Sequence, residues 1–169
     1  CLRILEATEH YLWPDAFERV RNLAVVATAL YAGLRRKELV GLKFLDVDLD
    51  DGTLRVVGGK GRGGGKDRIV PIASDLRHYL DAYLRHRRQQ GIVAPEFFCS
   101  RQTKRGISMM TLRRIVLAVR RASGVPFSLH SLRHSFVTQL LRSGVPLHTA
   151  SALAGHNQIT TTAGYLKVF

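Results

Sequence analysis

The strongest constraint on the fold is an apolar stretch at residues 17–30. Its apolar side chains recur in steps of three and four residues: Val20, Leu23, Ala24, Ala27, Leu30 and Tyr31. This spacing predicts an α-helix that is buried in the core. Gly33 stands where a glycine commonly ends a helix, so Arg35 is expected directly after a buried helix.

A glycine-rich basic segment at residues 58–66 separates two short apolar stretches. Residues 54–57 and residues 68–71 have the composition of β-strands, and glycine clusters between such stretches are typical of turns. We therefore expect a β-hairpin with a basic loop. The cations of this loop are Lys60, Arg62 and Lys66.

Further helices are predicted from capping residues and apolar spacing. Their expected limits are Ser74 to Gly91, Ser108 onward, His130 to residues 143–144, Pro146 to Gly155, and a last short helix from about Thr160. A chain of 169 residues with 46% hydrophobic composition can bury one good core. Residues 1–169 are therefore expected to form a single domain.

The charge balance indicates a polyanionic partner. Lys and Arg number 26 against 13 Asp and Glu, which gives a net charge of +13. Self-repulsion from such an excess destabilises a small protein unless a polyanion offsets it, and nucleic acid is the leading candidate. An anionic membrane is the alternative. It is disfavoured because there is no signal peptide and no apolar run long enough to span a bilayer, so a soluble protein is expected.

The two cysteines do not indicate a structural role. Cys1 and Cys99 stand in no spacing typical of zinc ligands, and two isolated cysteines do not make a disulfide framework. A reducing cytoplasm fits this composition.

Five separated motifs occur in a fixed order along the chain. They are residues 32–39 (AGLRRKEL), residues 59–61 (GKG), residues 68–71 (RIVP), residues 130–134 (HSLRH), and residues 154–156 (AGH) followed by Tyr165. In order and spacing, from about residue 6 to 168, the chain resembles the catalytic domain of the tyrosine recombinases, the phage integrase family. One such motif alone would be weak evidence, but five in sequence are specific.

The resemblance implies a mainly α-helical fold with a small antiparallel β-sheet (α+β) and DNA strand exchange without a cofactor or metal. The implied partner is double-stranded DNA, bound by a tetramer of full-length protomers, with no membrane. The implied setting is the cytoplasm, in a bacterial, phage or mobile-element context. The family's N-terminal DNA-binding domain is missing from the chain, and four residues follow Tyr165. A fragment or a minimal form is therefore expected.

Tyr165 stands at the position of the family's nucleophile. Without its neighbours it would be interpreted as a half-buried packing residue. A phenol has a pKa of about 10 and needs cationic surroundings before it attacks a phosphodiester. The resemblance assigns Tyr165 this role and implies a 3′-phosphotyrosyl intermediate.

Arg35 and Arg133 are the expected clamps for the phosphate. A planar guanidinium can donate two parallel hydrogen bonds to non-bridging oxygens, which a lysine cannot. Arg133 shares a predicted helix face with His130 and His134, whereas Arg35 is assigned mainly by the resemblance. Glu38 is expected either to orient Arg35, to support His130, or to form an ordinary surface ion pair.

His130 and His156 suit hydrogen bonding to the phosphate or transfer of the tyrosine proton, because the pKa of histidine lies near neutrality. A metal site is the alternative, since His130 and His134 are four residues apart. We reject it because no third ligand has an evident position and positive surroundings disfavour a divalent cation. His134 is expected to be structural.

Lys60 is expected to protonate the leaving 5′-oxygen. Lys66 is the alternative in the same hairpin, and Lys60 is preferred because it matches the family's glycine-lysine-glycine pattern. Both lysines could instead only neutralise backbone phosphates. The residues expected to contact DNA are Arg36, Arg62, Lys66 and Arg68.

Together these residues predict a site-specific DNA recombinase, or integrase, that acts by transesterification. A type IB topoisomerase is an alternative with the same chemistry. A catalytically inactive DNA-binding module of the same fold is another. The presence of two histidines favours the recombinase, and the complete residue set argues against the inactive module.

Overall fold

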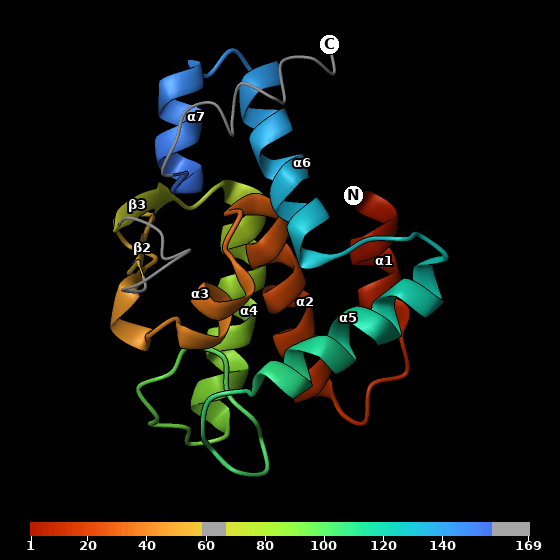
Figure 1. Ribbon diagram of the computed structural model, residues 1–169. Coiled ribbons are helices and arrows are strands. Elements are labelled where there is room, and N and C mark those ends of the chain that lie inside the picture. Colours follow the sequence, from red (N-terminus) through yellow and green to blue (C-terminus); the bar gives the residue numbers. More distant parts are fainter. Residues whose placement is uncertain (59–66, 157–169) are drawn as a thin grey trace.

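The computed structural model describes residues 1–58 and 67–156 (Figure 1). This part of the chain is mainly helical with a three-stranded antiparallel sheet, which confirms the predicted fold class. The elements are α1 (Leu2–His10), α2 (Ala16–Tyr31), α3 (Arg36–Gly41), the 3-10 helix η1 (Phe44–Asp46), β1 (Val47–Asp48), β2 (Thr53–Val56), β3 (Arg68–Pro71), α4 (Ser74–Gln89), α5 (Met109–Ser123), α6 (Leu129–Arg142) and α7 (Leu147–Ala154).

Helix α2 is the buried helix that the apolar stretch predicted. It packs against α1, α4 and α6, and residues 23–30 are all buried. Asp15 caps its N-terminus by accepting a 2.8 Å hydrogen bond from the Glu18 backbone. Gly33 follows the helix with φ +61°, and a Cβ there would lie 2.3 Å from the Phe136 ring. Glycine therefore allows α6 to approach the end of α2 closely.

Strands β2 and β3 form the predicted hairpin, and β1 adds a third strand. Leu54 pairs with Val70, and Val56 pairs with Arg68. Side chains alternate along β3, so that Arg68 and Val70 are buried while Ile69 is exposed. At the base of the loop the Gly58 backbone N–H donates a 2.7 Å hydrogen bond to the Asp67 carboxylate. The loop itself, residues 59–66, lies outside the described residues.

The predicted helix limits are correct in part. Ser108 caps α5 by accepting from the Thr111 backbone, and α6 ends just before residues 143–144. Ser74 is not the cap of α4 but its first helical residue, because Ala73 already takes the extended backbone conformation of a cap. The expected helix from Thr160 lies outside the described residues.

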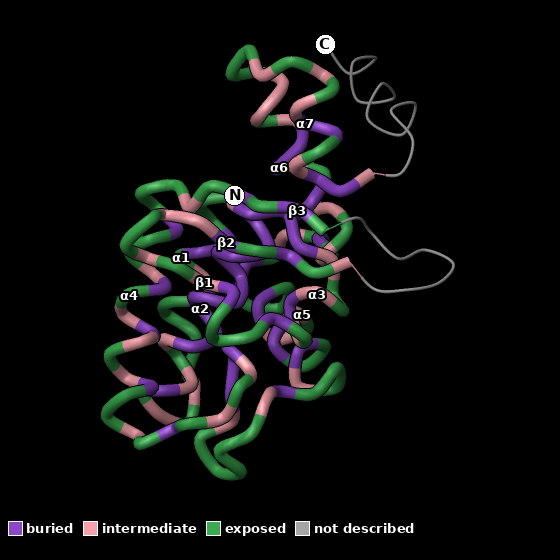
Figure 2. Tube along the Cα trace, turned by 90° about the vertical axis from the view of Figure 1, so that its left-hand side faces the viewer, coloured by how far each residue is buried: buried purple, intermediate pink, exposed green. Residues whose placement is uncertain are grey.

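Helices α6 and α7 rise above the rest of the fold (Figures 1 and 2). In Figure 1 the chain runs upward along α6, turns, and runs downward along α7, and α7 contacts β3. The C-terminal end of α7 therefore lies beside the sheet and not in solvent. This contact brings residues 153–156 to the segments that carry the predicted arginines.

Two negative findings hold for residues 1–58 and 67–156. No helix there is long and apolar enough to cross a membrane. No group of three or more His, Cys, Asp or Glu side chains gathers there as a metal site.

Candidate active site

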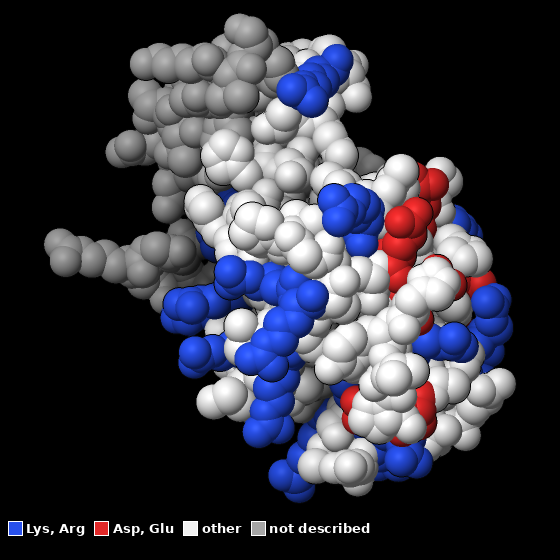
Figure 3. Space-filling model, turned by 90° about the vertical axis from the view of Figure 1, so that its right-hand side faces the viewer, with Lys and Arg blue, Asp and Glu red and all other residues white. Residues whose placement is uncertain are grey.

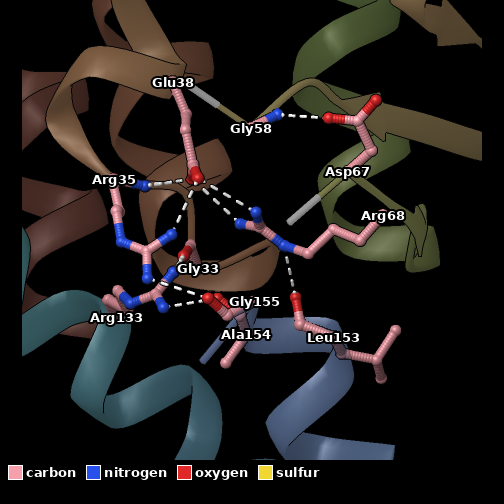
Figure 4. Close-up of polar contacts among 10 residues, drawn as sticks. All are labelled: Gly33, Arg35, Glu38, Gly58, Asp67, Arg68, Arg133, Leu153, Ala154 and Gly155. Carbon is pink, nitrogen blue, oxygen red and sulfur yellow. Dashed lines mark hydrogen bonds and ion pairs between the residues drawn. The ribbon is translucent and has the colours of Figure 1, made fainter. Parts of the chain in front are cut away.

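Three arginines from three different segments meet at the last turn of α7 (Figure 4). Each donates a hydrogen bond to one of three successive carbonyls: Arg68 to Leu153, Arg133 to Ala154, and Arg35 to Gly155. Carbonyls at the C-terminal end of a helix lack partners within the helix and carry partial negative charge. The guanidinium groups satisfy them. We call residues 153–155 the α7 end turn.

Arg35 lies at the N-terminus of α3, where the chain leaves the Gly33 turn. Its backbone N–H donates to Glu38 Oε2 at 2.7 Å, and its Nη1 donates to Glu38 Oε1 at 3.1 Å. Its Nη2 donates to the Gly155 carbonyl at 2.8 Å. Glu38 and the Gly155 carbonyl hold the guanidinium, and 30% of the Arg35 side chain remains exposed to solvent.

Glu38 is enclosed and does not form a surface ion pair. Only 6% of its side chain is exposed, and its carboxylate accepts hydrogen bonds from both Arg35 and Arg68. Burial alone would raise the pKa of Glu38. The hydrogen bonds and charge of Arg68, followed by those of Arg35, outweigh burial and hold this pKa below its usual value. Glu38 is therefore an ionised anchor between two arginines.

Arg68 is turned toward the interior. Its Nη1 and Nη2 donate to the two oxygens of Glu38, both at 2.9 Å, and its Nε donates to the Leu153 carbonyl at 2.7 Å. Only 5% of the side chain is exposed. We expected Arg68 to contact DNA, and the structure buries it against Glu38 and the α7 end turn. The alternation with Val70 along β3 was the sequence signal for this inward position.

Arg133 is buried on α6 at the centre of the site. Its Nη1 donates to the Gly33 carbonyl at 2.7 Å, and its Nη2 donates to the Ala154 carbonyl. The first carbonyl belongs to the turn before Arg35, and the second belongs to the α7 end turn. Arg133 therefore links α6 to the turn that precedes Arg35 and to the α7 end turn, which Arg35 also contacts.

His156 directly follows the α7 end turn. Gly155 takes a left-handed conformation with φ +67°, and the His156 backbone N–H donates to the Ser151 carbonyl at 3.0 Å. Partial burial lowers the pKa of His156 to about 4, and the nearby charges of Arg133, Arg35, Arg68 and His130 act in the same direction. The imidazole is therefore neutral at neutral pH.

His130 lies in the first turn of α6 and is exposed. Its ring centroid is 6.1 Å from that of His134, with the rings at 70°. Burial, and then the charge of His130, lower the pKa of His134. The charge of His130 also contributes, as the smallest of the causes, to the lowered pKa of His156.

Residues 2–169 match the model of the phage integrase family. The chain belongs to this family. It is 35% identical over 153 residues to tyrosine recombinase XerA of Pyrococcus furiosus, which covers 89% of the chain and 51% of XerA. It is 37% identical over 158 residues to tyrosine recombinase XerD of Ralstonia nicotianae, which covers 91% of the chain and 50% of XerD. The chain thus spans about half the length of these relatives.

Solved structures of the phage integrase family have the same fold. A crystal structure of XerA recombinase superposes with a TM-score of 0.81 at 31% identity, over 97% of this chain and 56% of XerA. The XerH recombinase bound to its difH substrate before cleavage gives 0.78 at 25% identity, over 98% of this chain and 47% of XerH. A lambda integrase dimer on a core site, at 22% identity and a TM-score of 0.67, shares the fold.

The integrase motifs that lie in the described residues come together in space. Arg35, Arg133, His156 and Glu38 form one cluster, and the charge of His130 acts on the pKa of His156. Lys60, Arg62, Lys66 and Tyr165 lie outside the described residues, so their places in the cluster stay predictions. Sequence reasoning missed the part played by the backbone carbonyls of the α7 end turn. No side-chain pattern signals such acceptors.

Exposed cations lie on α3, which follows Arg35, and on α5. α3 and α5 pack against each other, and both carry exposed basic residues: Arg36, Lys37, Arg113 and Arg114. Figure 3 shows one face of the molecule, on which Lys and Arg gather in a patch and acidic residues are fewer. Arg36 is exposed, and its expected contact to a DNA backbone stays a prediction.

Proposed function

We propose that this chain is the catalytic domain of a site-specific DNA recombinase that cuts and rejoins DNA through a covalent tyrosine link. The observation that supports this most is the convergence of Arg35, Arg133 and His156 at the α7 end turn. Family membership and the similarity to XerA and XerD support it further. The proposed domain comprises residues 1–169.

The proposed reaction is a transesterification at phosphorus. The Tyr165 oxygen attacks the scissile phosphate, a P–O bond to tyrosine forms, and the bond to the 5′-oxygen breaks. The product is a 3′-phosphotyrosyl link and a free 5′-hydroxyl. In the second half of the reaction the 5′-hydroxyl of a partner strand attacks this link and releases tyrosine. The energy of the phosphodiester is kept, so the reaction needs no nucleotide cofactor.

Arg35 and Arg133 are the proposed clamps for the non-bridging oxygens. These oxygens gain negative charge in the transition state, and fixed guanidinium donors stabilise that charge without having to reorganise. Both arginines donate hydrogen bonds to backbone carbonyls, and Arg35 also binds the Glu38 carboxylate, so their positions are fixed before DNA binds. Pre-organised donors of this kind contribute about 3 kcal/mol each to an oxyanion transition state.

His156 is proposed to act as a neutral imidazole. With a pKa of about 4 it carries no charge at neutral pH, so it has one ring nitrogen that donates and one that accepts. It can accept the phenol proton of Tyr165 or donate to a non-bridging oxygen. His130 is assigned the second donor position, and Lys60 the transfer of a proton to the leaving 5′-oxygen.

Double-stranded DNA is the proposed substrate. The XerH structure holds its difH substrate, and the net charge of +13 suits a polyanion. We also propose that full-length protomers assemble as tetramers on paired sites and act in the cytoplasm. Arg36, Arg62 and Lys66 are the proposed contacts to the DNA backbone.

Covalent trapping tests the proposal. The protein is incubated in EDTA with duplexes that have randomised recognition arms and a nick beside the cleavage position, so that a short strand leaves after cleavage and the reaction cannot reverse. We expect a denaturant-stable adduct in which Tyr165 carries a 3′-phosphate, located by mass spectrometry. Tyr165→Phe should bind DNA equally and trap none. Tyr11→Phe, which alters an exposed tyrosine, should trap like the wild type.

Two results would contradict the proposed reaction: an adduct formed by Tyr165→Phe, or a strict need for a divalent metal. Sequencing of the trapped DNA separates the related alternatives. A recombinase should enrich particular arms from the pool. Relaxation of supercoiled plasmid with no enriched sequence would indicate a topoisomerase instead, and DNA binding without any adduct would indicate an inactive module.

A further inference from the structure

Arg68 is a buried member of the arginine cluster, and its partners lie in two separate segments. Its guanidinium contacts Glu38, which lies in α3, and Leu153, which lies at the end of α7. These segments are 30 and 85 residues away from it in the chain. With 5% of its side chain exposed, Arg68 has no open face for a DNA phosphate. Its position calls for a role other than DNA contact.

The geometry of these contacts uses the whole guanidinium group. Two parallel N–H donors meet the two oxygens of Glu38 at 2.9 Å, and the Nε–H turns away to the Leu153 carbonyl at 2.7 Å. Only the planar fork of arginine can make this set of three bonds at once. A lysine at the same place could reach Glu38 or Leu153 as a single point charge, but it could not fix the plane of the carboxylate.

The plane of the Glu38 carboxylate matters because the same oxygens hold Arg35. Oε1 accepts from Nη1 of Arg35 and from Nη1 of Arg68, and Oε2 accepts from the Arg35 backbone and from Nη2 of Arg68. Arg35 is the more exposed of the two guanidinium groups, at 30% against 5%. Arg68 therefore fixes the carboxylate from the inside while Arg35 faces outward.

Arg68 also holds the α7 end turn on which the cluster rests. Its bond to Leu153 is the first of the three carbonyl contacts, and Gly155 passes so close that a Cβ there would lie 2.8 Å from Nη1 of Arg68. Arg35 and Arg133 bind the next two carbonyls of the same turn. A shift of Arg68 would therefore displace the acceptors of both clamps.

We propose that Arg68 is a positioning residue of the recombination reaction: it locks Glu38 to the α7 end turn and thereby directs the Arg35 guanidinium at the scissile phosphate. This inference rests on the proposed function, because Arg35 has a phosphate to meet only if the chain cleaves DNA. Arg68 itself does not touch the substrate. Its loss should therefore lower the rate of cleavage and leave DNA affinity nearly unchanged.

The test measures single-turnover cleavage of a trapped sequence by Arg68→Met and by a matched control. The control is Arg55→Met on neighbouring strand β2. Arg55 also pairs with a buried carboxylate, but its partner is Asp46, at 2.9 Å, and not Glu38. We expect Arg68→Met to cleave about 10²-fold more slowly, the scale of a small misplacement of a reacting group. Arg55→Met should cleave like the wild type, and Arg68→Lys should not restore the rate.

A substrate change separates positioning from general loss of structure. A methylphosphonate at the scissile position removes the charge of one non-bridging oxygen, so a guanidinium directed at that oxygen is no longer needed. The rate defect of Arg68→Met should shrink on the diastereomer that also relieves Arg35→Ala. A defect caused by a damaged fold would be the same on every substrate.

The double variant Arg68→Met, Glu38→Gln covers the case in which Arg68→Met alone fails to fold, because it leaves no buried carboxylate without its partner. Its defect should be smaller than the product of the two single defects, since both residues share the Arg68–Glu38 contact. If the wild type forms no adduct, the proposed function fails and this inference with it. If the wild type cleaves and Arg68→Met cleaves equally well, or its defect is unchanged on both diastereomers, only the role of Arg68 is overturned.

Discussion

Replacement of Gly155 by alanine should damage catalysis far more than stability alone would explain. Gly155 has φ +67°, a conformation that side chains rarely adopt. A Cβ at this position would lie 2.8 Å from Nη1, 3.0 Å from Cζ and 3.1 Å from Cδ of Arg68. The guanidinium cannot yield freely, because Nη1 is bonded to Glu38 at 2.9 Å and Nε to Leu153 at 2.7 Å.

The expected cost has two parts. A left-handed alanine costs about 1–2 kcal/mol relative to its usual conformation. Forcing an extra methyl group into a packed site adds about 1–3 kcal/mol. Gly155→Ala should therefore lower the free energy of unfolding by roughly 2–5 kcal/mol. It should also slow cleavage about 10²-fold, because the carbonyls that hold Arg35 and Arg133 move with the turn.

Gly124→Ala is the matched control. Gly124 ends α5 with φ +64°, and no atom lies within 4 Å of the position of an added Cβ. It should lose only the conformational part, about 1–2 kcal/mol, and should cleave at the wild-type rate. Urea unfolding and single-turnover cleavage measure both effects. Equal losses of stability in the two variants, or normal cleavage by Gly155→Ala, would refute the steric argument.

Three further predictions concern the clamps, the acid and the imidazole. Arg133→Lys should lose most of its cleavage rate, by about 3 kcal/mol in activation free energy, whereas Arg142→Lys on the exposed last turn of α6 should be nearly silent. A scissile phosphate with sulfur at the 5′-bridging position should rescue Lys60→Ala but not Lys66→Ala, because a thiolate leaves without a proton. The pKa of His156 is about 4 in the fold against its usual 6.5, so the unfolded chain binds the extra proton and stability is lost as the pH falls from 6.5 toward 4. His156→Gln should lose less stability than the wild type in that window, as measured by urea unfolding, and an equal loss would count against the neutral imidazole.

Local sequence patterns predicted the central helix and the hairpin because each depends on side chains close in sequence. The apolar spacing of residues 17–30 and the strand composition on both sides of residues 58–66 were sufficient. Helix α1 was missed because its burial is confined to Ile4, Leu5 and Thr8, too few positions to show a helical period. The two-residue strand β1 is shorter than any pattern can indicate.

The sequence predicted which side chains form the cluster but not the backbone contacts that hold them. Family motifs supplied Arg35, Arg133 and His156, and in the described residues these come together. The two arginines are held by backbone carbonyls that are distant in the chain. Arg133 binds Gly33 and Ala154, which are 100 and 21 residues away, and Arg35 binds Gly155, which is 120 residues away. Such contacts arise only when α6, α7 and β3 have packed, so neither spacing nor composition can reveal them. Arg68 is different. We expected it to contact DNA, although the period-two alternation with Val70 could have indicated a buried side chain.

The charges of the cluster suit a phosphate that becomes more negative as it reacts. The cluster holds three guanidinium groups, of Arg35, Arg68 and Arg133, and the ionised carboxylate of Glu38, which binds the first two. These four groups together carry two excess positive charges. The partial negative charge of the α7 end turn offsets part of this excess, and the excess helps to lower the pKa of His156. A bound phosphodiester supplies one negative charge, and attack by a phenolate brings a second. The excess is therefore matched best in the transition state, which is the condition for electrostatic catalysis.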